Sequence, residues 1–204
     1  MSSETKKASL DFIQMALTLF AITAVVAVLL ALANSVTAPI IEKSAQDRLN
    51  QSLNSLMKEA VTFEEMTEYS KKVNIGGVTV PVIAAYQGRN QSEEVTGYCI
   101  HVAPTGYSDA IEMMVAVNGE GAVSGVQILS ISDTPGIGMK VQSDAEFQNS
   151  LLGLSEQANI VKSAPQKPTD IQVISGASIS SAAYINGVNA ALETAQVLMQ
   201  EVES

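Results

Sequence analysis

The feature that most constrains this chain is the run from Phe12 to Ile41, which contains no charged residue. Its centre, Ala16 to Ala33, consists almost entirely of Ala, Leu, Val, Ile, Phe and Thr. A helix that crosses a bilayer needs about 20 apolar residues, and a helix satisfies its own backbone polar groups there. The run therefore predicts one transmembrane helix, which we place at residues 12–36.

The residues before this run indicate its orientation. Lys6 and Lys7 precede it, and because cytoplasmic segments are rich in Lys and Arg, residues 1–11 are expected to be a cytoplasmic N-terminus. The alternative is a cleaved signal peptide, since Ala31-Leu32-Ala33 has the pattern of a cleavage site, but the apolar stretch is longer than a usual signal-peptide core. Either interpretation places the bulk of the chain outside the cytoplasm, and we favour the uncleaved anchor.

Residues 37–70 predict an amphipathic connecting helix and a linker. Thr37-Ala38-Pro39 is expected to end the membrane run, because the residue before a proline disfavours the helical conformation. Further on, apolar residues recur at helical spacing, at Leu49, Leu53, Leu56, Met57 and Ala60. This helix is expected to pack on the core of the domain that follows.

From about Val73 the apolar period changes to that of strands. Strands are expected at Val78–Ile83, Val95–Val102, Ile111–Val117, Val123–Ile131, Asn159–Lys162 and Ile171–Ile174. Asn118-Gly119-Glu120-Gly121 predicts a hairpin, and helices are expected at Asp144–Leu152, with Ser143 as its cap, and at Ile179–Val202. Strands followed by helices, without regular βαβ alternation, predict an α+β domain over residues 71–204 with a mainly antiparallel sheet and flanking helices.

Composition excludes several classes of function. The chain has 21 acidic and 11 basic residues and a net charge of −10, whereas nucleic-acid binding needs a basic surface. The single cysteine, Cys99, rules out an internal disulfide and a multi-cysteine metal site within the chain, and is interpreted as a buried apolar residue. The single histidine, His101, is interpreted as a strand-surface residue, so enzymatic hydrolysis ranks last.

Ser175-Gly176-Ala177-Ser178 stands between a predicted strand and the last predicted helix. Small residues let a backbone approach a ligand closely, and glycine permits a tight turn. Free amides and the positive end of the helix converge at Ser178, where a phosphate is the natural occupant. The alternative is that Ser175 or Ser178 is only a helix cap.

Asp133-Thr134-Pro135-Gly136-Ile137-Gly138 directly follows the second strand of the predicted hairpin. A Pro-Gly step makes a turn, and nearby glycines leave backbone amides uncovered. By itself the motif is more typical of an ordinary strand-exit turn. Because it lies on a different element from Ser175–Ser178, the two motifs are candidates to face one cavity.

The order of these parts resembles the FMN-binding subunits RnfG and NqrC of the ion-pumping Rnf and Nqr respiratory complexes. The resemblance covers nearly the whole chain. It comprises the anchor ending in Asn34–Pro39, then Gly106-Tyr107, Val123–Val126, Thr134–Gly138 and Ser175–Ser178. It implies an extracytoplasmic domain that carries FMN as a phosphoester on the last hydroxyl of the second motif, Ser178, attached by a dedicated FMN transferase.

The resemblance also implies which residues surround the flavin. The expected cofactor-binding residues are Ser178 as the covalent acceptor, with Ser175, Gly176, Ala177, Thr134, Pro135, Gly136, Ile137, Gly138 and Tyr107. Tyr107 is the preferred ring contact, ahead of Tyr98 and Tyr184. No metal ligand and no catalytic residue is expected.

This sequence departs from the family at three positions. Ser178 stands where the family usually has threonine, Gln172 where it tends to have an acid, and Asp133 where it has glutamate. A serine hydroxyl forms the same ester as a threonine hydroxyl. Ser180 and Ser181 are less favoured alternative acceptors.

The implied function is electron transfer in a membrane-bound, ion-translocating complex, more like Rnf (ferredoxin and NAD) than Nqr. The chain is then a redox subunit that binds no organic substrate of its own, and its partners are the other subunits, the membrane and the FMN transferase. Two alternatives stay open. One is a stand-alone anchored flavoprotein, and the other is a non-redox binding module in which Ser178 only caps a helix.

Overall fold

The computed structural model describes residues 2–66 and 70–202, with side chains described for residues 13–66 and 70–201. Lys6 and Lys7, on which the expected orientation depends, lie outside the described side chains. The chain divides into two compact units, residues 1–47 and 48–204. The first unit is helical, and the second contains the sheets and the remaining helices.

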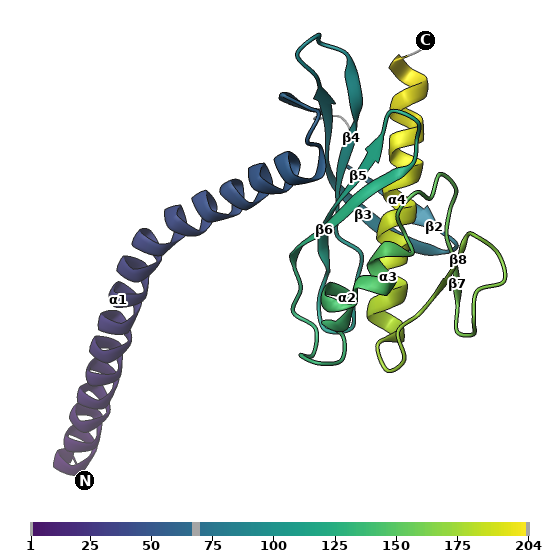
Figure 1. Cartoon of the computed structure of the whole chain (residues 1–204). Coiled ribbons are helices and arrows are strands. Elements are labelled where there is room, and N and C mark those ends of the chain that lie inside the picture. Colours follow the sequence, from purple (N-terminus) through teal and green to yellow (C-terminus); the bar gives the residue numbers. More distant parts are fainter. Residues whose placement is uncertain (1, 67–69, 203–204) are drawn as a thin grey trace. The chain divides into compact units, whose positions relative to one another are not determined.

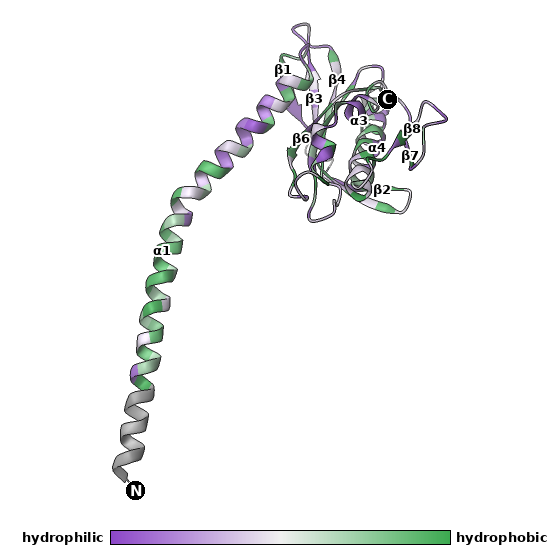
Figure 2. Cartoon of the chain, turned by 60° about the horizontal axis from the view of Figure 1, so that its bottom comes forward, coloured by the Kyte–Doolittle hydropathy of each residue, from purple (hydrophilic) through white to green (hydrophobic). Residues whose placement is uncertain are grey.

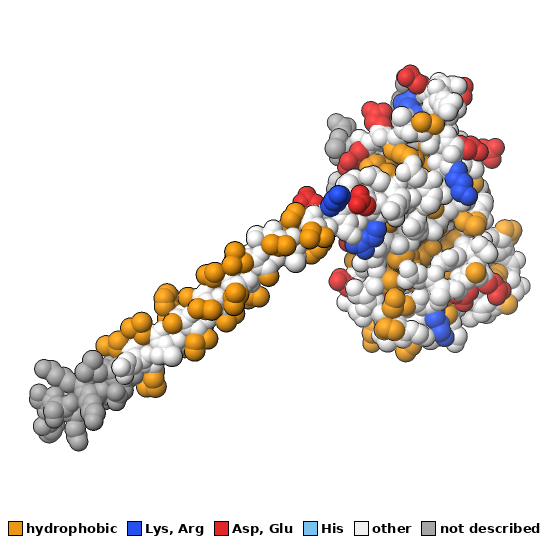
Figure 3. Space-filling view, turned by 60° about the vertical axis from the view of Figure 1, so that its left-hand side comes forward, with side chains coloured by type: hydrophobic (Ala, Val, Ile, Leu, Met, Phe, Trp, Pro, Cys, Tyr) orange, Lys and Arg blue, Asp and Glu red, His pale blue; other side chains and the backbone are white. Residues whose placement is uncertain are grey.

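Helix α1 spans Ser2–Leu56 and is one candidate membrane span, with a mean hydropathy of 2.7 in its most apolar window. Its large apolar side chains between Ile13 and Ile41 are 49–70% exposed. Figure 2 shows this stretch as the hydrophobic part of the helix, and Figure 3 shows hydrophobic side chains along it. A helix with apolar residues exposed on all sides needs an apolar surrounding.

The expected end of the helix at Pro39 is wrong, because α1 continues through Pro39 to Leu56. A proline inside a helix removes one backbone hydrogen bond and crowds the preceding turn. The polar segment beyond Pro39 has good helix-forming residues, such as Glu42, Lys43, Ala45 and Gln46, which favour continuation.

The second unit contains a six-stranded antiparallel sheet in the order β1-β3-β4-β5-β6, with β2 also pairing with β3 (Figure 1). Its strands are β1 (Thr62–Glu65), β2 (Lys71–Ile75), β3 (Val78–Arg89), β4 (Val95–Val102), β5 (Glu112–Asn118) and β6 (Val123–Ser130). Two short helices, α2 (Lys140–Ser143) and α3 (Ala145–Asn149), follow the sheet. A parallel pair, β7 (Asn159–Val161) and β8 (Asp170–Gln172), precedes the last helix, α4 (Ser178–Val202). The predicted α+β architecture is confirmed.

Most predicted elements are present, and the differences have physical reasons. Strands β1 and β2 were not predicted, because edge strands such as these carry charged residues that hide the strand period. Strand β3 extends six residues beyond the expected end at Ile83. The cap of α3 is Asp144, which accepts a hydrogen bond from the Phe147 amide, and not Ser143.

Both faces of the sheet are covered. Helix α4 packs on one face, and its fully buried Tyr184, Ile185 and Val188 belong to the main core. The other face packs on the end of α1 and the following turn through Leu53, Met57 and Ala60. The amphipathic helix predicted around Leu49–Ala60 therefore does pack on the domain core.

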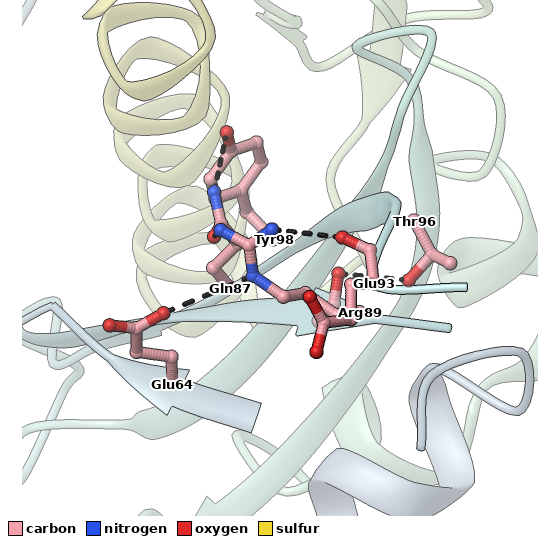
Figure 4. Close-up of polar contacts among 7 residues, drawn as sticks. Glu64, Gln87, Arg89, Glu93, Thr96 and Tyr98 are labelled. Atoms are coloured by element: carbon pink, nitrogen blue, oxygen red, sulfur yellow. Dashed lines mark hydrogen bonds and ion pairs between the residues drawn. The ribbon is translucent and has the colours of Figure 1, made fainter. Parts of the chain in front are cut away.

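A polar cluster connects β3 to its neighbours β1 and β4 (Figure 4). Buried Gln87 donates to the Tyr98 hydroxyl at 3.3 Å and accepts from the Arg89 guanidinium at 2.6 Å. Arg89 also lies 3.9 Å from the Glu64 carboxylate on β1. Tyr98 is thus a buried side chain whose hydroxyl is already hydrogen-bonded within the sheet.

Candidate functional site

The motif after β6 forms a tight turn. The Thr134 carbonyl accepts from the amides of Ile137, at 3.2 Å, and Met139, at 3.3 Å, and Gly136 has φ +73°. Proline second and a positive-φ glycine third is the pattern of a type II turn. The turn directs the Ile137 side chain outward, where it is 52% exposed.

A second turn leads directly into α4. The Ala177 amide donates to the Ile174 carbonyl at 2.9 Å, and Gly176 has φ +82°. The first intrahelical bond runs from the Ser181 amide to the Ala177 carbonyl. The amides of Ser178, Ile179 and Ser180 therefore stand at the helix N-terminus without an intrahelical acceptor, as the first amides of any helix do.

Asp133 connects these turns to a third segment. Its side chain is 2% exposed, and its Oδ1 accepts from the amides of Ser108, at 2.8 Å, and Tyr107, at 3.1 Å. Its Oδ2 accepts from the Ser180 hydroxyl at 2.6 Å. One carboxylate thus holds together the segment at Tyr107, the turn after β6 and the first turn of α4.

The same contacts determine the ionisation of Asp133. Burial acts to raise the pKa of Asp133, but the hydrogen bonds from Ser180, Ser108 and Tyr107 outweigh it and hold the pKa below its ordinary value. The carboxyl group is therefore negatively charged at neutral pH.

Two glycines let the backbone approach this carboxylate. A Cβ atom at Gly138 would lie 2.6 Å from Asp133 Cβ and 2.8 Å from Ser180 Oγ. A Cβ atom at Gly106 would lie 2.7 Å from the Asp109 carbonyl oxygen and 3.1 Å from Asp133 Oδ2. Both positions need glycine for lack of space.

The three segments surround one cavity of about 410 Å³. Its lining residues are Tyr107, Thr134, Ile137, Gly138, Gly176, Ala177, Ser178, Ile179 and Ser180. Tyr107 and Ile179 are 68% and 55% exposed, so with Ile137 they form an apolar rim. The two motifs, far apart in sequence, thus face one cavity.

The serine hydroxyls at this end of α4 are not equivalent. Ser178 is exposed, lines the cavity and makes no hydrogen bond with its side chain among the described residues. Ser180 is buried and donates to Asp133, whereas Ser181 is fully buried and accepts from the Ile174 amide at 3.1 Å. Of the three hydroxyls, that of Ser178 is therefore the one exposed to the cavity and not engaged in a hydrogen bond among the described residues.

The cavity can hold a phosphate and a flat ring system. The amides at the α4 N-terminus are suited to bind a phosphate, and the apolar rim offers a surface for stacking. Among the described residues, none that lines the cavity is Lys, Arg or His. The polar groups that the described lining residues offer to an anion are therefore amides and hydroxyls.

Not every residue expected at the site lies at the cavity. Tyr107, Thr134, Ile137, Gly138, Gly176, Ala177 and Ser178 line it, whereas Ser175, Pro135 and Gly136 do not. Pro135 and Gly136 form the turn that supports the wall. The alternative ring contacts Tyr98 and Tyr184 are buried in the core, and Tyr184 packs edge-on against Phe147 with ring centroids 5.4 Å apart.

Sequence reasoning missed two contributions to the site. Ile179 was not considered, although a residue next to the acceptor on an N-terminal helical turn shares its surroundings. Asp133 was noted as the first residue of the turn motif and as a departure from the family. Its role in joining three segments is visible only in the three-dimensional structure.

His101 and Cys99 lie elsewhere, on strand β4. His101 is buried, contrary to the expected surface position, because its sheet face is the one that carries Cys99 and is covered by the end of α1. Burial lowers the pKa of His101, and Glu112, whose carboxylate lies 3.9 Å from Nε2, offsets only part of this effect. The imidazole is therefore neutral at neutral pH, and this contact is then not an ion pair. Burial also raises the pKa of Cys99 to about 12, so the thiol is unreactive, as expected.

The chain is similar to known proteins over nearly its whole length. The FMN-binding domain family matches residues 106–193, which include every residue that lines the cavity. The G subunit of the Na(+)-translocating ferredoxin:NAD(+) oxidoreductase complex of Acetobacterium woodii is 30% identical over 96% of this chain and 99% of its own. The G subunit of the ion-translocating oxidoreductase complex of Methanosarcina acetivorans is 26% identical over 91% of this chain and 95% of its own. Among solved structures, Shewanella oneidensis NqrC matches with a TM-score of 0.48 and 12% identity, covering 72% of this chain and 73% of that one.

Proposed function

This chain belongs to the family of FMN-binding G subunits of ion-translocating oxidoreductase complexes, and we propose that it passes electrons through an FMN esterified to Ser178. The complex that this proposal implies is of the Rnf type, in which electron transfer between ferredoxin and NAD is coupled to ion transport. The relatives named above are subunits of such complexes.

The observation that carries the proposal is the exposed Ser178 hydroxyl in a cavity shared by both motifs. The residues present fit an esterified FMN. The amides of Ile179 and Ser180 lie at the helix N-terminus beside Ser178 without an intrahelical acceptor. Gly176 and Ala177 add little bulk to the cavity wall, and Tyr107, Ile137 and Ile179 offer apolar surface for the ring. When bound, FMN supplies electron transfer in steps of one or two electrons.

The ester links Ser178 Oγ to phosphorus. In this reaction the Ser178 hydroxyl would give its proton to a base of the transferase and form the O–P bond, while the bond from phosphorus to the leaving group of an activated flavin nucleotide would break and the leaving group would depart with the bonding electrons. No described residue at the cavity is placed to act as the base for this reaction: Asp133 already accepts three hydrogen bonds. This fits attachment by a separate FMN transferase.

The chain is anchored to a membrane by α1. We propose that its N-terminus is cytoplasmic and its FMN domain extracytoplasmic, because Lys6 and Lys7 precede the apolar run. Protease added to intact spheroplasts is expected to cleave the domain, and full protection there would reverse the orientation.

The test of the site is flavin fluorescence of the chain after denaturing electrophoresis, with the intact mass as a second measurement. Wild-type chain co-produced with the transferase is expected to carry one FMN, and Ser178→Ala to carry none. Ser178→Thr is the matched control, because it keeps a hydroxyl at the same atom and is expected to keep the flavin. An unmodified wild-type mass would refute covalent attachment.

Membership in a complex is tested separately from the flavin. Purification of the native chain in mild detergent is expected to bring the other membrane subunits with it. A chain that carries FMN but purifies alone would instead support the stand-alone flavoprotein.

A further inference from the structure

A buried negative charge lies directly behind a cavity wall that offers no cation among its described residues. The Asp133 carboxylate contacts two lining residues, accepting from the Tyr107 amide and the Ser180 hydroxyl. Gly138, also in the lining, approaches the same carboxylate so closely that a Cβ atom there would lie 3.1 Å from Asp133 Oδ2. Asp133 is therefore one layer of atoms away from whatever fills the cavity.

The charge on Asp133 is also fixed in place. It accepts three hydrogen bonds from three different residues and is 2% exposed. Those bonds outweigh the effect of burial and keep its pKa below the ordinary value. The Asp133 side chain therefore cannot rotate away from an anion in the cavity.

The positive end of α4 does not cancel this charge. A helix N-terminus is equivalent to about half a positive charge, and the described lining residues include no basic side chain. Among the groups that line the cavity or lie directly behind its wall, the full negative charge of Asp133 thus exceeds the partial positive charge of the helix end. Such a site binds a dianion less favourably than a monoanion.

On the basis of the proposed function, we infer that the cavity accepts the flavin phosphate only as the monoanionic diester with Ser178, that it rejects the free nucleotide, and that Asp133 sets this preference. A free phosphate monoester carries a charge of about −1.5 to −2 at pH 7, because its second pKa is about 6. The diester with Ser178 has no second acidic proton and carries a single negative charge. Esterification thus removes the excess charge that the site does not neutralise.

Asp133→Asn isolates the charge with little change in shape. Oδ1 accepts both backbone amides, and an asparagine keeps this oxygen. Oδ2 accepts the Ser180 hydroxyl and, at 3.4 Å, a second branch of the Tyr107 amide bond. An asparagine NH₂ in its place donates to the same hydroxyl oxygen and gives up only the long contact with Tyr107. The three-way connection is kept while the charge is removed.

The experiment compares free FMN with riboflavin, which has the same ring and side chain but no phosphate. Both are titrated into the full-length Ser178→Ala chain in detergent, and quenching of flavin fluorescence is measured. Riboflavin is expected to bind at least as tightly as FMN. Adding Asp133→Asn is expected to raise the FMN affinity relative to riboflavin by on the order of tenfold, since one charge at close range is removed.

A second variant makes the test independent of Asp133 itself. Thr134 is exposed and lines the cavity, so Thr134→Arg adds a cation without disturbing the core. It is expected to shift the ratio of FMN to riboflavin affinity in the same direction as Asp133→Asn. Tighter binding of FMN than of riboflavin to the Ser178→Ala chain would overturn the inference, and so would failure of both charge variants to change that ratio.

These outcomes are separate from those of the proposed function. If the wild-type chain carries no flavin, covalent attachment fails, whatever the titrations give. If the wild-type chain carries flavin and the Ser178→Ala chain also binds free FMN tightly, only the role of Asp133 fails.

Discussion

Ser178 and Ser180, two residues apart at the start of α4, are expected to respond oppositely to replacement by alanine. Ser180→Ala removes a 2.6 Å hydrogen bond from a buried hydroxyl to an ionised carboxylate. Because hydrogen bonds to charged groups contribute about 1.5–3 kcal/mol, the free energy of unfolding is expected to fall by about 2 kcal/mol. For a domain of this size, that is a fall in Tm of about 4–8 °C. Ser178→Ala removes an exposed hydroxyl and is expected to change stability by less than about 0.5 kcal/mol, yet to abolish the flavin.

The assay uses full-length chain in detergent, with unfolding followed by the near-UV circular dichroism of the buried tyrosines Tyr98 and Tyr184. Both variants are compared with wild-type chain produced without the FMN transferase, so that loss of a stabilising cofactor does not count as loss of a contact. Equal destabilisation by the two variants would mean that Ser178 is a structural cap. An unchanged Tm in Ser180→Ala would mean that the contact with Asp133 does not stabilise the first turn of α4.

The ionisable groups and the close packing lead to three more predictions. Because the pKa of Asp133 is lowered in the folded state, its contribution to stability is complete above its ordinary pKa of 3.8 and is lost as the pH falls through the folded-state value. Ser180→Ala should move this loss to higher pH, as measured by the denaturant midpoint at each pH. An unchanged dependence of the midpoint on acidic pH would contradict this prediction. The lowered pKa of His101 means that the folded state loses stability as the pH falls below 6.5; His101→Leu should remove this decline, and its persistence would assign it to another group. Gly138→Ala places a Cβ atom 2.6 Å from Asp133 Cβ and should cost about 1–3 kcal/mol of unfolding free energy. Gly119→Ala, whose nearest contact is at 3.6 Å, should cost far less, and an equal loss in both variants would argue against crowding.

The parts of the fold that were predictable from sequence are those with a strong local period. Strand β4 has the predicted bounds Val95–Val102, and the hairpin between β5 and β6 is fixed by Asn118, whose side chain accepts from the amides of Glu120 and Ala122. Strands β1 and β2 escaped notice because charged edge residues replace the apolar alternation. The burial of His101 depends on the end of α1 covering a sheet face, which is a long-range contact that no local pattern reveals.

The two motifs of the candidate site were predictable from sequence, but the spatial arrangement of their side chains was not. Their residues and their order indicated a phosphate site at Ser178, and both motifs do face one cavity. The family resemblance already favoured Ser178 over Ser180 and Ser181, but the differences in burial and hydrogen-bond partners among the three hydroxyls are visible only in the structure. The same is true of Asp133, whose partners lie 25 to 47 residues away in sequence.

Ser178 begins a 25-residue helix whose following turns fill the centre of the domain, with Tyr184, Ile185 and Val188 completely enclosed. The proposed point of FMN attachment therefore lies on backbone that is anchored in the core and has little freedom to move by itself. An electron donor or acceptor for the proposed flavin would accordingly have to approach a fixed position on this domain.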